Sequence, residues 1–244
     1  MSQDATTLIE RLDLRLPLIG LYDSPDFKAF APTVRPEPKA HQCIFSFYQN
    51  WLKGETLLLA NGNYGCGGAA RSLGNIAVRS RADFISFLVD EEGLKATHQL
   101  MDGWIDRHPP YRQEHDYLLI GPLRREQDHS LRTVTFFVGP DQLSALIIGA
   151  NYYHAPGDPM PVLAPFGSAC MQMLPAFDDL SVPQAIIGGT DIAMRQHLPP
   201  SVLTFTVTKP MFERLCSLDQ RSFLYKAFLE RLRKARGSAR LSGQ

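Results

Sequence analysis

Short apolar runs alternate with amphipathic stretches along this chain, and that alternation limits the possible folds more than any other feature. The apolar runs predict strands at 16–22, 56–60, 117–120, 133–138, 185–187 and 202–207. Their composition is too apolar for a sheet with one face open to water. Strands alternating with helices are typical of a sheet covered by helices. We therefore expect an α/β or α+β fold, with a mixed sheet and helices packed on it. The strand order is left open.

The stretches between these runs predict helices. In His41–Lys53, residues Cys43, Phe47 and Trp51 recur at four-residue intervals, and Gly54 follows as a stop. Further helices are predicted at 4–12, 80–90, 95–107, 141–153, 210–215 and 222–236. These helices supply the apolar faces that a central sheet needs.

Length and composition favour one domain. The chain has 244 residues, of which 44% are hydrophobic, enough for a substantial core. We expect a single α/β domain over residues 1–236 and a flexible basic tail over 237–244. The basic side chains near this end are Arg231, Arg233, Lys234, Arg236 and Arg240. A solvated helix face explains them, and an anionic partner is the alternative.

The charge balance limits the partners. Lys and Arg together number 25, as do Asp and Glu, so no net charge attracts a polyanion or an anionic membrane. The first residues lack a signal-peptide pattern, and the apolar run 143–150 is too short to span a bilayer. We expect a cytoplasmic protein with no nucleic-acid and no membrane partner. The oligomeric state is not indicated.

Four cysteines lie far apart, with no C-x-x-C pair, at Cys43, Cys66, Cys170 and Cys216. In a reducing cytosol they are expected to be thiols. Their remaining roles are packing, catalysis or metal binding. Cys43 and Cys216 lie on apolar helix faces, where a cysteine commonly acts as a small hydrophobic residue.

The most unusual local composition is Gly65-Cys66-Gly67-Gly68. Glycines let the backbone approach a ligand closely, and exposed amides at a helix start can bind an anion. The segment is neither a P-loop nor a dinucleotide fingerprint, because the required residues do not follow. Close packing of helix on sheet is an equally good explanation.

A second segment, Pro165-Phe166-Gly167-Ser168-Ala169-Cys170, resembles the first in its layout. Ser168 is a candidate N-cap, which would place Cys170 in the first turn of a helix. The positive end of a helix dipole lowers the pKa of a thiol and favours the reactive thiolate. Cys66 and Cys170 are therefore candidates for a catalytic nucleophile.

The third segment is Gly188-Gly-Thr-Asp-Ile-Ala-Met-Arg195, which is expected to turn into a helix. Asp191 and Arg195 are four residues apart and could pair on one helix face. Alternatively, Asp191 caps the helix and Arg195 faces a pocket that binds a carboxylate or phosphate.

Three of the cysteines could converge on one centre. Cys43, Cys66 and Cys170 would offer soft thiolates for zinc or an iron–sulfur cluster, with one coordination position left open. His41 could add a nitrogen ligand. The leading hypothesis is such a centre beside a site for a small anionic molecule. The alternatives are a metal-free enzyme with a cysteine nucleophile, and a non-catalytic small-ligand sensor or assembly protein.

These three segments, together with 116–123, 138–143 and 205–207, carry a family resemblance. The chain resembles the family called domain of unknown function 169 from about Leu16 to Leu229. The resemblance implies a stand-alone cytoplasmic domain of bacteria and archaea, and it brings no reaction or cofactor. Many members have Gly where this chain has Ala169. The family motifs resemble the segments that hold Cys43, Cys66 and Cys170, whereas Cys216 lies outside them.

Overall fold

The computed structural model describes residues 3–37, 41–60, 66–73, 80–174, 176–177 and 179–241, with backbone alone at 3–4 and 237–241. The strands are β1 (Ile19–Ser24), β2 (Thr33–Val34), β3 (Thr56–Ala60), β4 (Tyr117–Pro122), β5 (Leu131–Val138), β6 (Val162–Leu163), β7 (Ala185–Gly188) and β8 (Leu203–Thr208). The α-helices are α1 (Gln3–Leu12), α2 (Tyr48–Leu52), α3 (Gly67–Ser72), α4 (Arg81–Ser86), α5 (His98–Arg107), α6 (Pro140–Asn151), α7 (Lys209–Cys216) and α8 (Ala227–Leu241).

Shorter helical turns join these elements. They are η1 (Lys28–Phe30), η2 (Ile44–Phe47), η4 (Arg125–Ser130), η5 (Met171–Met173), η6 (Arg195–His197) and η7 (Phe223–Tyr225), with a π-helical turn, η3 (Phe87–Glu91).

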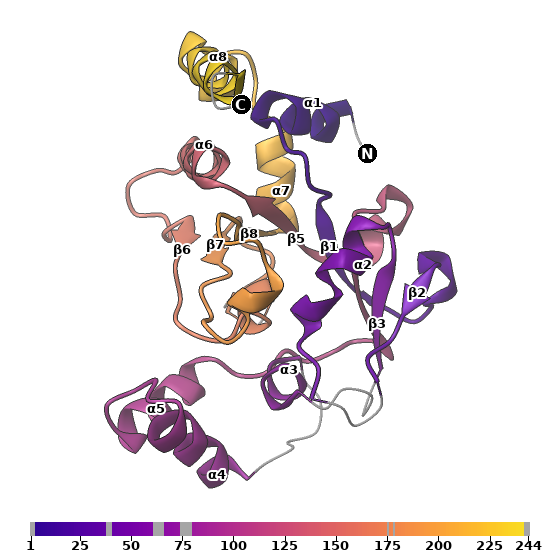
Figure 1. The fold of residues 1–244 in the computed structure, drawn as a ribbon, viewed down its shortest axis with the longest axis vertical. Coiled ribbons are helices and arrows are strands. Elements are labelled where there is room, and N and C mark those ends of the chain that lie inside the picture. Colours follow the sequence, from indigo (N-terminus) through magenta and orange to yellow (C-terminus); the bar gives the residue numbers. More distant parts are fainter. Residues whose placement is uncertain are drawn as a thin grey trace.

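The strands of this part of the chain form one mixed sheet in the order β2-β3-β4-β1-β5-β8-β7-β6. Central pairs are antiparallel, and the two edge pairs, β2 with β3 and β6 with β7, are parallel. Helices surround the sheet (Figure 1). The expected mixed sheet with packed helices is thus confirmed, and the fold is of the α/β class. The sequence pattern missed β2 and β6, because two-residue strands have no readable periodicity.

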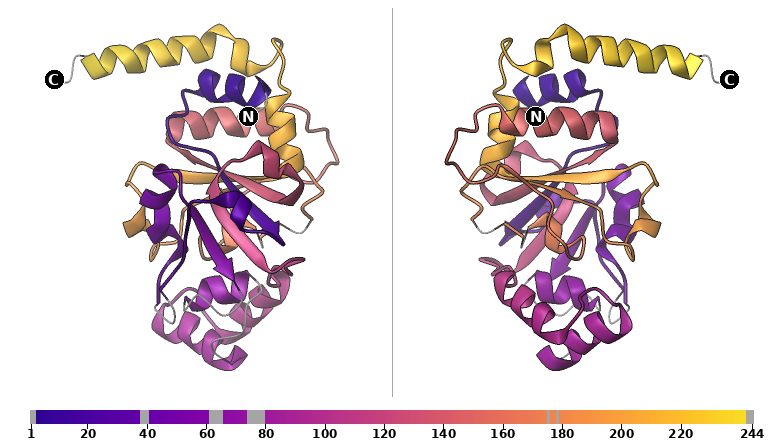
Figure 2. Two further views of the ribbon diagram at one scale, coloured as in Figure 1. Left: turned by 90° about the vertical axis from the view of Figure 1, so that its right-hand side faces the viewer. Right: turned by 90° about the vertical axis from the view of Figure 1, so that its left-hand side faces the viewer.

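Alternating strand residues divide the core into two. On one face, which we call the helical face, Tyr22, Phe136 and Phe205 pack in a cluster that includes residues of α1, α6, α7 and α8. Figure 2 shows these helices stacked at one end of the molecule. On the other face, which we call the thiol face, Leu21 and Phe137 pack with residues of η2, α2 and α3. Successive residues of a strand point to opposite faces, which separates the two cores.

Two predicted helices are not regular α-helices over most of their length. Residues 41–53 form η2 and then the short α2, because their buried aromatic side chains spread over several helix faces and tertiary packing sets the winding. Residues 188–195 form a turn and η6 in place of a helix. Gly189 has φ +71°, and the Asp191 carboxylate accepts from the Ala193 amide at 3.0 Å, which closes an Asx turn.

The helical pair predicted at 80–107 is present as α4, η3 and α5. We call residues 80–108 the helical cap; Figure 1 shows its helices at the lower end of the molecule, next to α3. At the opposite end, the helix predicted at 222–236 is interrupted: η7 covers its start, Lys226 is extended, and α8 begins at Ala227 and continues to Leu241. Within the described ranges, every helix is too short or too polar to cross a lipid bilayer.

Candidate functional site

Three cysteines from three distant segments meet in one apolar cluster on the thiol face. Cys170 is buried in this cluster, and Cys43 and Cys66 are half-buried against it. Cys43 lies immediately before η2, Cys66 immediately before α3, and Cys170 immediately before η5. Cys216 packs against the other core, on the helical face. We call Cys43, Cys66 and Cys170 the thiol site.

Burial holds two of these thiols in the protonated form. It raises the pKa of Cys170 to about 12 and that of Cys43 to about 11. The electrostatic influence of Cys66 and of the Asp191 carboxylate raises the pKa of both thiols further, which places these groups near one another. The lowered pKa expected for Cys170 is therefore wrong. The helix after it, η5, has three residues and no sizeable dipole to offset desolvation.

The segment before Cys170 packs on the start of α3. Ser168 does not cap a helix as expected; its Oγ lies 3.2 Å from the Cys170 Sγ, and this hydrogen bond favours the thiolate, against the effect of burial. A methyl group built on Gly68 would lie 3.9 Å from the Ser168 Cβ. The turn that holds Cys170 and the helix that follows Cys66 are thus neighbours, with room for a methyl group between Gly68 and Ser168.

The glycines after Cys66 are not needed for backbone conformation. Gly67 and Gly68 are part of α3 and have no positive φ. A Cβ built on Gly67 would have no described atom within 4 Å, apart from its chain neighbours and the backbone of its own helix. Gly67 is therefore not required for close packing of the helix on the sheet, which was one of the two explanations of this glycine-rich segment. A side chain at position 67 would have room beside Cys66. Gly65, also predicted to contact a ligand, lies outside the described residues.

Asp191 joins the third sequence segment to the thiol site. Its Oδ2 accepts a hydrogen bond from the Ala169 amide at 3.2 Å, so the carboxylate is fixed beside the turn that holds Cys170. It raises the pKa of Cys43 and Cys170, as expected for a negative charge near both thiols. Asp191 is thus an acidic residue that acts on two cysteines of the thiol site.

Arg195 has a different role from either of those predicted for it. Its guanidinium group donates to four backbone carbonyls, which are those of Gly189, Val202, Pro199 and Pro200. Its hydrogen-bond partners among the described residues are thus backbone carbonyls and not the Asp191 carboxylate, and these bonds hold the loop 189–202 in place. Carbonyl acceptors are the same for every residue type, so a sequence pattern does not reveal them.

Sequence reasoning did not single out Gln172, which is fully buried and joins two of the segments. Its Nε2 donates to the Pro165 carbonyl at 3.0 Å and to the Thr190 Oγ1 at 2.9 Å. Its Oε1 accepts from the Gly189 amide at 3.0 Å. A buried side-chain amide with its bonding groups satisfied stabilises one arrangement of the chain. Gln172 therefore positions the loops on both sides of Cys170.

A second residue was missed: Asp23, a fully buried carboxylate at the end of β1. It accepts from the Tyr111 hydroxyl at 2.6 Å and from the amides of Glu114 and His115 at 2.8 and 2.9 Å. Burial and this hydrogen bond raise the pKa of Tyr111. The Tyr111 amide in turn donates to the Ser72 carbonyl at the end of α3. In the sequence, Asp23 belongs to an Asp-Ser-Pro that ends a strand. Nothing in the neighbouring residues indicates that its carboxylate is buried.

The thiol site is not a ready-made site for one metal ion. Among the residues that the structure describes, no three His, Cys, Asp or Glu side chains are arranged as ligands of a single ion. The site does provide three soft donors, one carboxylate and an apolar surrounding. This donor set suits a larger thiolate-bound centre or a buried thiol reaction.

The sequence comparisons agree with the resemblance noted above. The model of the DUF169 family, described as "Uncharacterised ArCR", matches residues 7–217. No curated protein and no solved structure matches the chain. The match includes the three segments that build the thiol site, as well as most of the sheet. The chain therefore belongs to the DUF169 family.

Proposed function

We propose that the thiol site binds an iron–sulfur cluster through Cys43, Cys66 and Cys170, with one iron left open for a small anionic molecule. The observation that carries the proposal is that three thiols from distant parts of the chain pack in one apolar cluster and lie close enough to affect one another's pKa. Packing alone requires apolar side chains at these places and gives no reason for three sulfurs to gather. Cys216 fills such a packing role on the other face.

A cluster suits the arrangement better than a zinc ion does. Zinc–sulfur bonds of about 2.3 Å bring the sulfurs of one ion within about 4 Å of each other. The described residues contain no such group around one ion. A cubane cluster joins thiolates that are roughly 6–7 Å apart, so it can connect side chains that a single ion cannot. Zinc would need a rearrangement of the segments.

The protonated state of the thiols fits a site that is filled by a cation. Burial disfavours a bare thiolate at Cys43 and Cys170, and a positively charged iron centre reverses that preference. Binding therefore releases protons and strengthens as the pH rises. The same burial argues against Cys170 as a free nucleophile, since a nucleophilic cysteine needs a lowered pKa.

The open coordination position would lie on the side of Gly67. A Cβ built on this residue would meet no described atom beyond its chain neighbours and its own helix backbone, and the backbone has no conformational need for glycine there. A small anion bound there would approach the α3 backbone closely. Arg195 takes no part, because its donors are engaged by carbonyls.

We also infer that the protein works in a reducing compartment such as the cytoplasm. The four cysteines are thiols in the structure, and an iron–sulfur centre would need reduced cysteines. This inference stands or fails with the proposed cluster.

The test is chemical reconstitution under strict anaerobic conditions with iron and sulfide. Wild-type protein should retain stoichiometric iron and acid-labile sulfide after desalting and show the absorption of a cluster. Separate Cys43→Ser, Cys66→Ser and Cys170→Ser variants should lose most of both, whereas Cys216→Ser, the matched control on the helical face, should retain them. Equal retention in all four variants would contradict the proposal.

A further inference from the structure

A pocket opens at the end of the molecule opposite the helical cap, between α8, the end of α1 and the start of α6. Its volume is about 550 Å³, within the range of pockets that bind small organic molecules. Figure 1 shows the three helices grouped at this end, and Figure 2 shows α8 on top of α1 with α6 beneath. The pocket is therefore separate from the thiol site, and what it binds does not depend on the proposed function.

Apolar side chains line the pocket where it meets the core of the helical face. They are Leu12 of α1, Ala145 of α6, and Leu229 and Leu232 of α8. Leu12, Ala145 and Leu229 belong to the core itself, and Leu232 is half-buried beside them. An apolar portion of a ligand would cover these side chains and remove their surface from water.

The acidic residues of the pocket are already paired. Each of the three carboxylates that line it forms an ion pair: Asp13 with Arg15 at 3.1 Å, Asp141 with Arg236 at 2.7 Å, and Glu230 with Arg11 at 3.8 Å. This pairing offsets their repulsion of an anion. Two of the pairs also connect α8 to its neighbours, since Arg11 belongs to α1 and Asp141 to α6.

Arg233 of α8 lines the same pocket between these two connections. It is four residues after Leu229 and three before Arg236, so it lies on the same side of the helix as both. Within the part of the chain that the structure describes, Arg233 forms no ion pair, in contrast to Arg236. Lys234 adds a second basic side chain to the lining. The pocket thus presents a positive charge beside an apolar surface.

We infer that this pocket binds a small amphipathic anion, with its carboxylate or phosphate on Arg233 and its apolar portion on Leu229 and Leu232. A guanidinium group can bind either anion through two parallel hydrogen bonds. A molecule with only the charge or only the apolar portion would use part of the site and bind more weakly. One of the basic side chains that a solvated helix face would explain therefore has a use of its own.

The test is isothermal titration calorimetry of the full-length protein with octanoate, which has both features. Octanoate should bind about tenfold or more tightly than octan-1-ol, which lacks the charge, and than acetate, which lacks the chain. Arg233→Gln should weaken octanoate binding by about tenfold or more and leave octan-1-ol unchanged. The matched control is Arg231→Gln, whose side chain lies over the Phe228 ring at 4.4 Å on another side of α8. It should bind octanoate like wild type.

A second variant, Gln142→Trp, fills the pocket from α6 without a change of charge and should abolish octanoate binding. If this variant does not fold, the comparison of Arg233→Gln with Arg231→Gln decides. Wild-type protein that does not bind octanoate, or equal binding by wild type and Arg233→Gln, would overturn the inference.

Vesicles of phosphatidylglycerol distinguish a free anion from a lipid surface. The inference predicts that vesicles do not compete with octanoate. Sedimentation of the protein with the vesicles, weakened alike in Arg231→Gln and Arg233→Gln and without binding of free octanoate, would assign the basic side chains to a membrane surface and overturn the inference. A failed iron reconstitution would leave these outcomes unaffected.

Discussion

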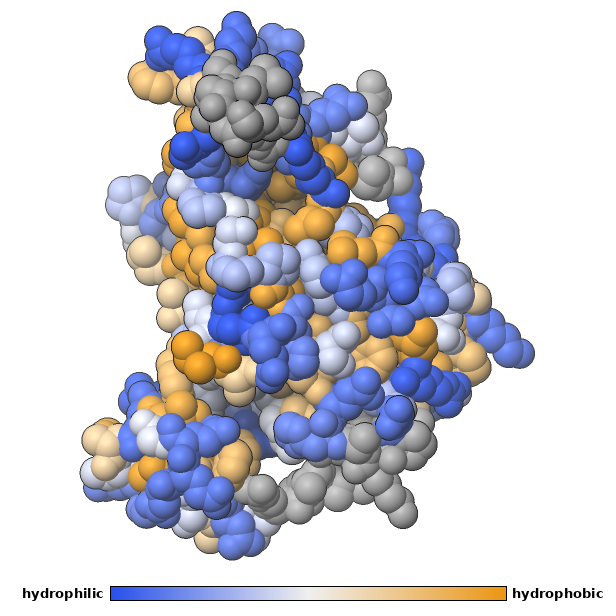
Figure 3. All heavy atoms as spheres, viewed as in Figure 1, coloured by the Kyte–Doolittle hydropathy of each residue, from blue (hydrophilic) through white to orange (hydrophobic). Residues whose placement is uncertain are grey.

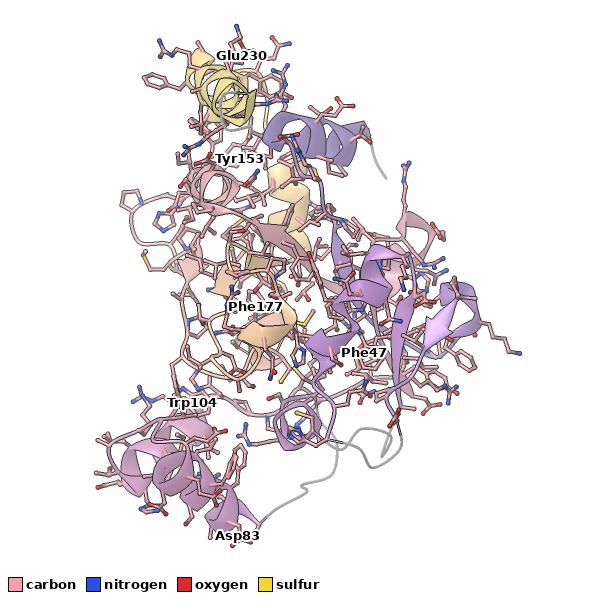
Figure 4. All side chains as sticks on the ribbon, in the orientation of Figure 1. Phe47, Asp83, Trp104, Tyr153, Phe177 and Glu230 are labelled. Atoms are coloured by element: carbon pink, nitrogen blue, oxygen red, sulfur yellow. The ribbon has the colours of Figure 1, made fainter. Side chains whose placement is uncertain are left out.

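The two faces of the sheet are built in different ways. The helical face is covered by longer helices, α1, α6, α7 and α8, and its core is made of ordinary apolar side chains. The thiol face is covered by short or irregular elements, η2, α2, α3 and η5, and its core contains three cysteines. Figure 4 shows Phe47 and Phe177 in this second region, and Tyr153 and Glu230 toward the helical end.

The difference concerns what fixes each face. Apolar stripes on long helices are sufficient to hold the helical face. The thiol face depends on individual polar residues, Gln172, Asp191 and Arg195, each of which bonds backbone groups of a neighbouring loop. Loops fixed by single buried side chains are typical of sites, because they place groups that a regular element cannot. The surface shows the same division only weakly, with apolar and polar side chains mixed on the visible face in Figure 3.

The largest expected effect is on the reactivity of Cys170. A variant that keeps only this cysteine should react with iodoacetamide at pH 7.4 about a thousandfold more slowly when folded than in urea. The pKa rises from 9.0 to about 12, and each unit lowers the thiolate fraction tenfold. Rates measured by mass spectrometry in both states test this. If the rate in urea exceeded the rate in the folded protein by less than tenfold, Cys170 would be accessible to solvent and the prediction would be contradicted.

Removal of the buried charge at Asp23 should be the most costly change to stability. Asp23→Asn leaves three donors without their carboxylate and should lower the free energy of unfolding by about 3–5 kcal/mol. The matched control is Asp141→Asn on the helical side, which breaks an exposed ion pair with Arg236 and should cost less than about 1 kcal/mol. Urea denaturation measures both. Equal losses would mean that the two regions do not differ in this respect.

The pH dependence of stability should separate the faces in the alkaline range. Burial raises the pKa of Cys170 in the folded state, so the unfolded chain loses the proton first and stability falls as the pH rises from 9 toward 12. This thiol contributes up to about 1.4 kcal/mol per pH unit. Cys170→Ser should flatten the curve from pH 9. Tyr22→Phe, on the helical face, should flatten it only above pH 10, since burial raises the pKa of Tyr22 from 10.0 to about 12. If the two variants gave the same dependence of stability on pH, the prediction would be refuted.

The smallest effects should come from two glycines of the thiol face. Gly167 has φ +144° and a Cβ there would lie 2.3 Å from the Met171 Cε, so Gly167→Ala should destabilise by about 1–3 kcal/mol. Gly67→Ala adds a methyl group at the first residue of α3, where it would meet no described atom beyond its own helix and chain neighbours, and should change stability by less than about 0.5 kcal/mol. Thermal unfolding of both variants measures the contrast. Destabilisation by Gly67→Ala would show that the space beside Cys66 is filled.

Sequence patterns predicted the regular elements and failed at the loops. Runs such as 56–60 and 133–138 are buried nearly throughout, so their short apolar stretches marked the strands correctly. The roles of Arg195 and Gln172 depend on backbone groups brought near by the fold, and backbone groups have no sequence identity. The direction of the Cys170 pKa was wrong for the same reason, because burial is a property of the folded chain.

The predicted convergence of cysteines came from a likeness between two glycine-containing turns. The structure places Cys66 and Cys170 in one cluster, although the helix dipoles that suggested the comparison are small or absent at η5. The likeness of the two turns therefore predicted correctly that Cys66 and Cys170 lie in one cluster. It predicted the wrong direction for the pKa of Cys170. The chemistry of the thiol site depends on desolvation.

The central claim is that the three sulfurs of the thiol face share one iron–sulfur centre. The most direct measurement is Mössbauer spectroscopy of wild-type protein reconstituted with ⁵⁷Fe, alongside the Cys170→Ser and Cys216→Ser variants. The account predicts the signals of a cubane cluster in wild type and Cys216→Ser, and their loss in Cys170→Ser. Wild-type protein with only adventitious ferrous iron, or a cluster that survives in Cys170→Ser, would contradict it.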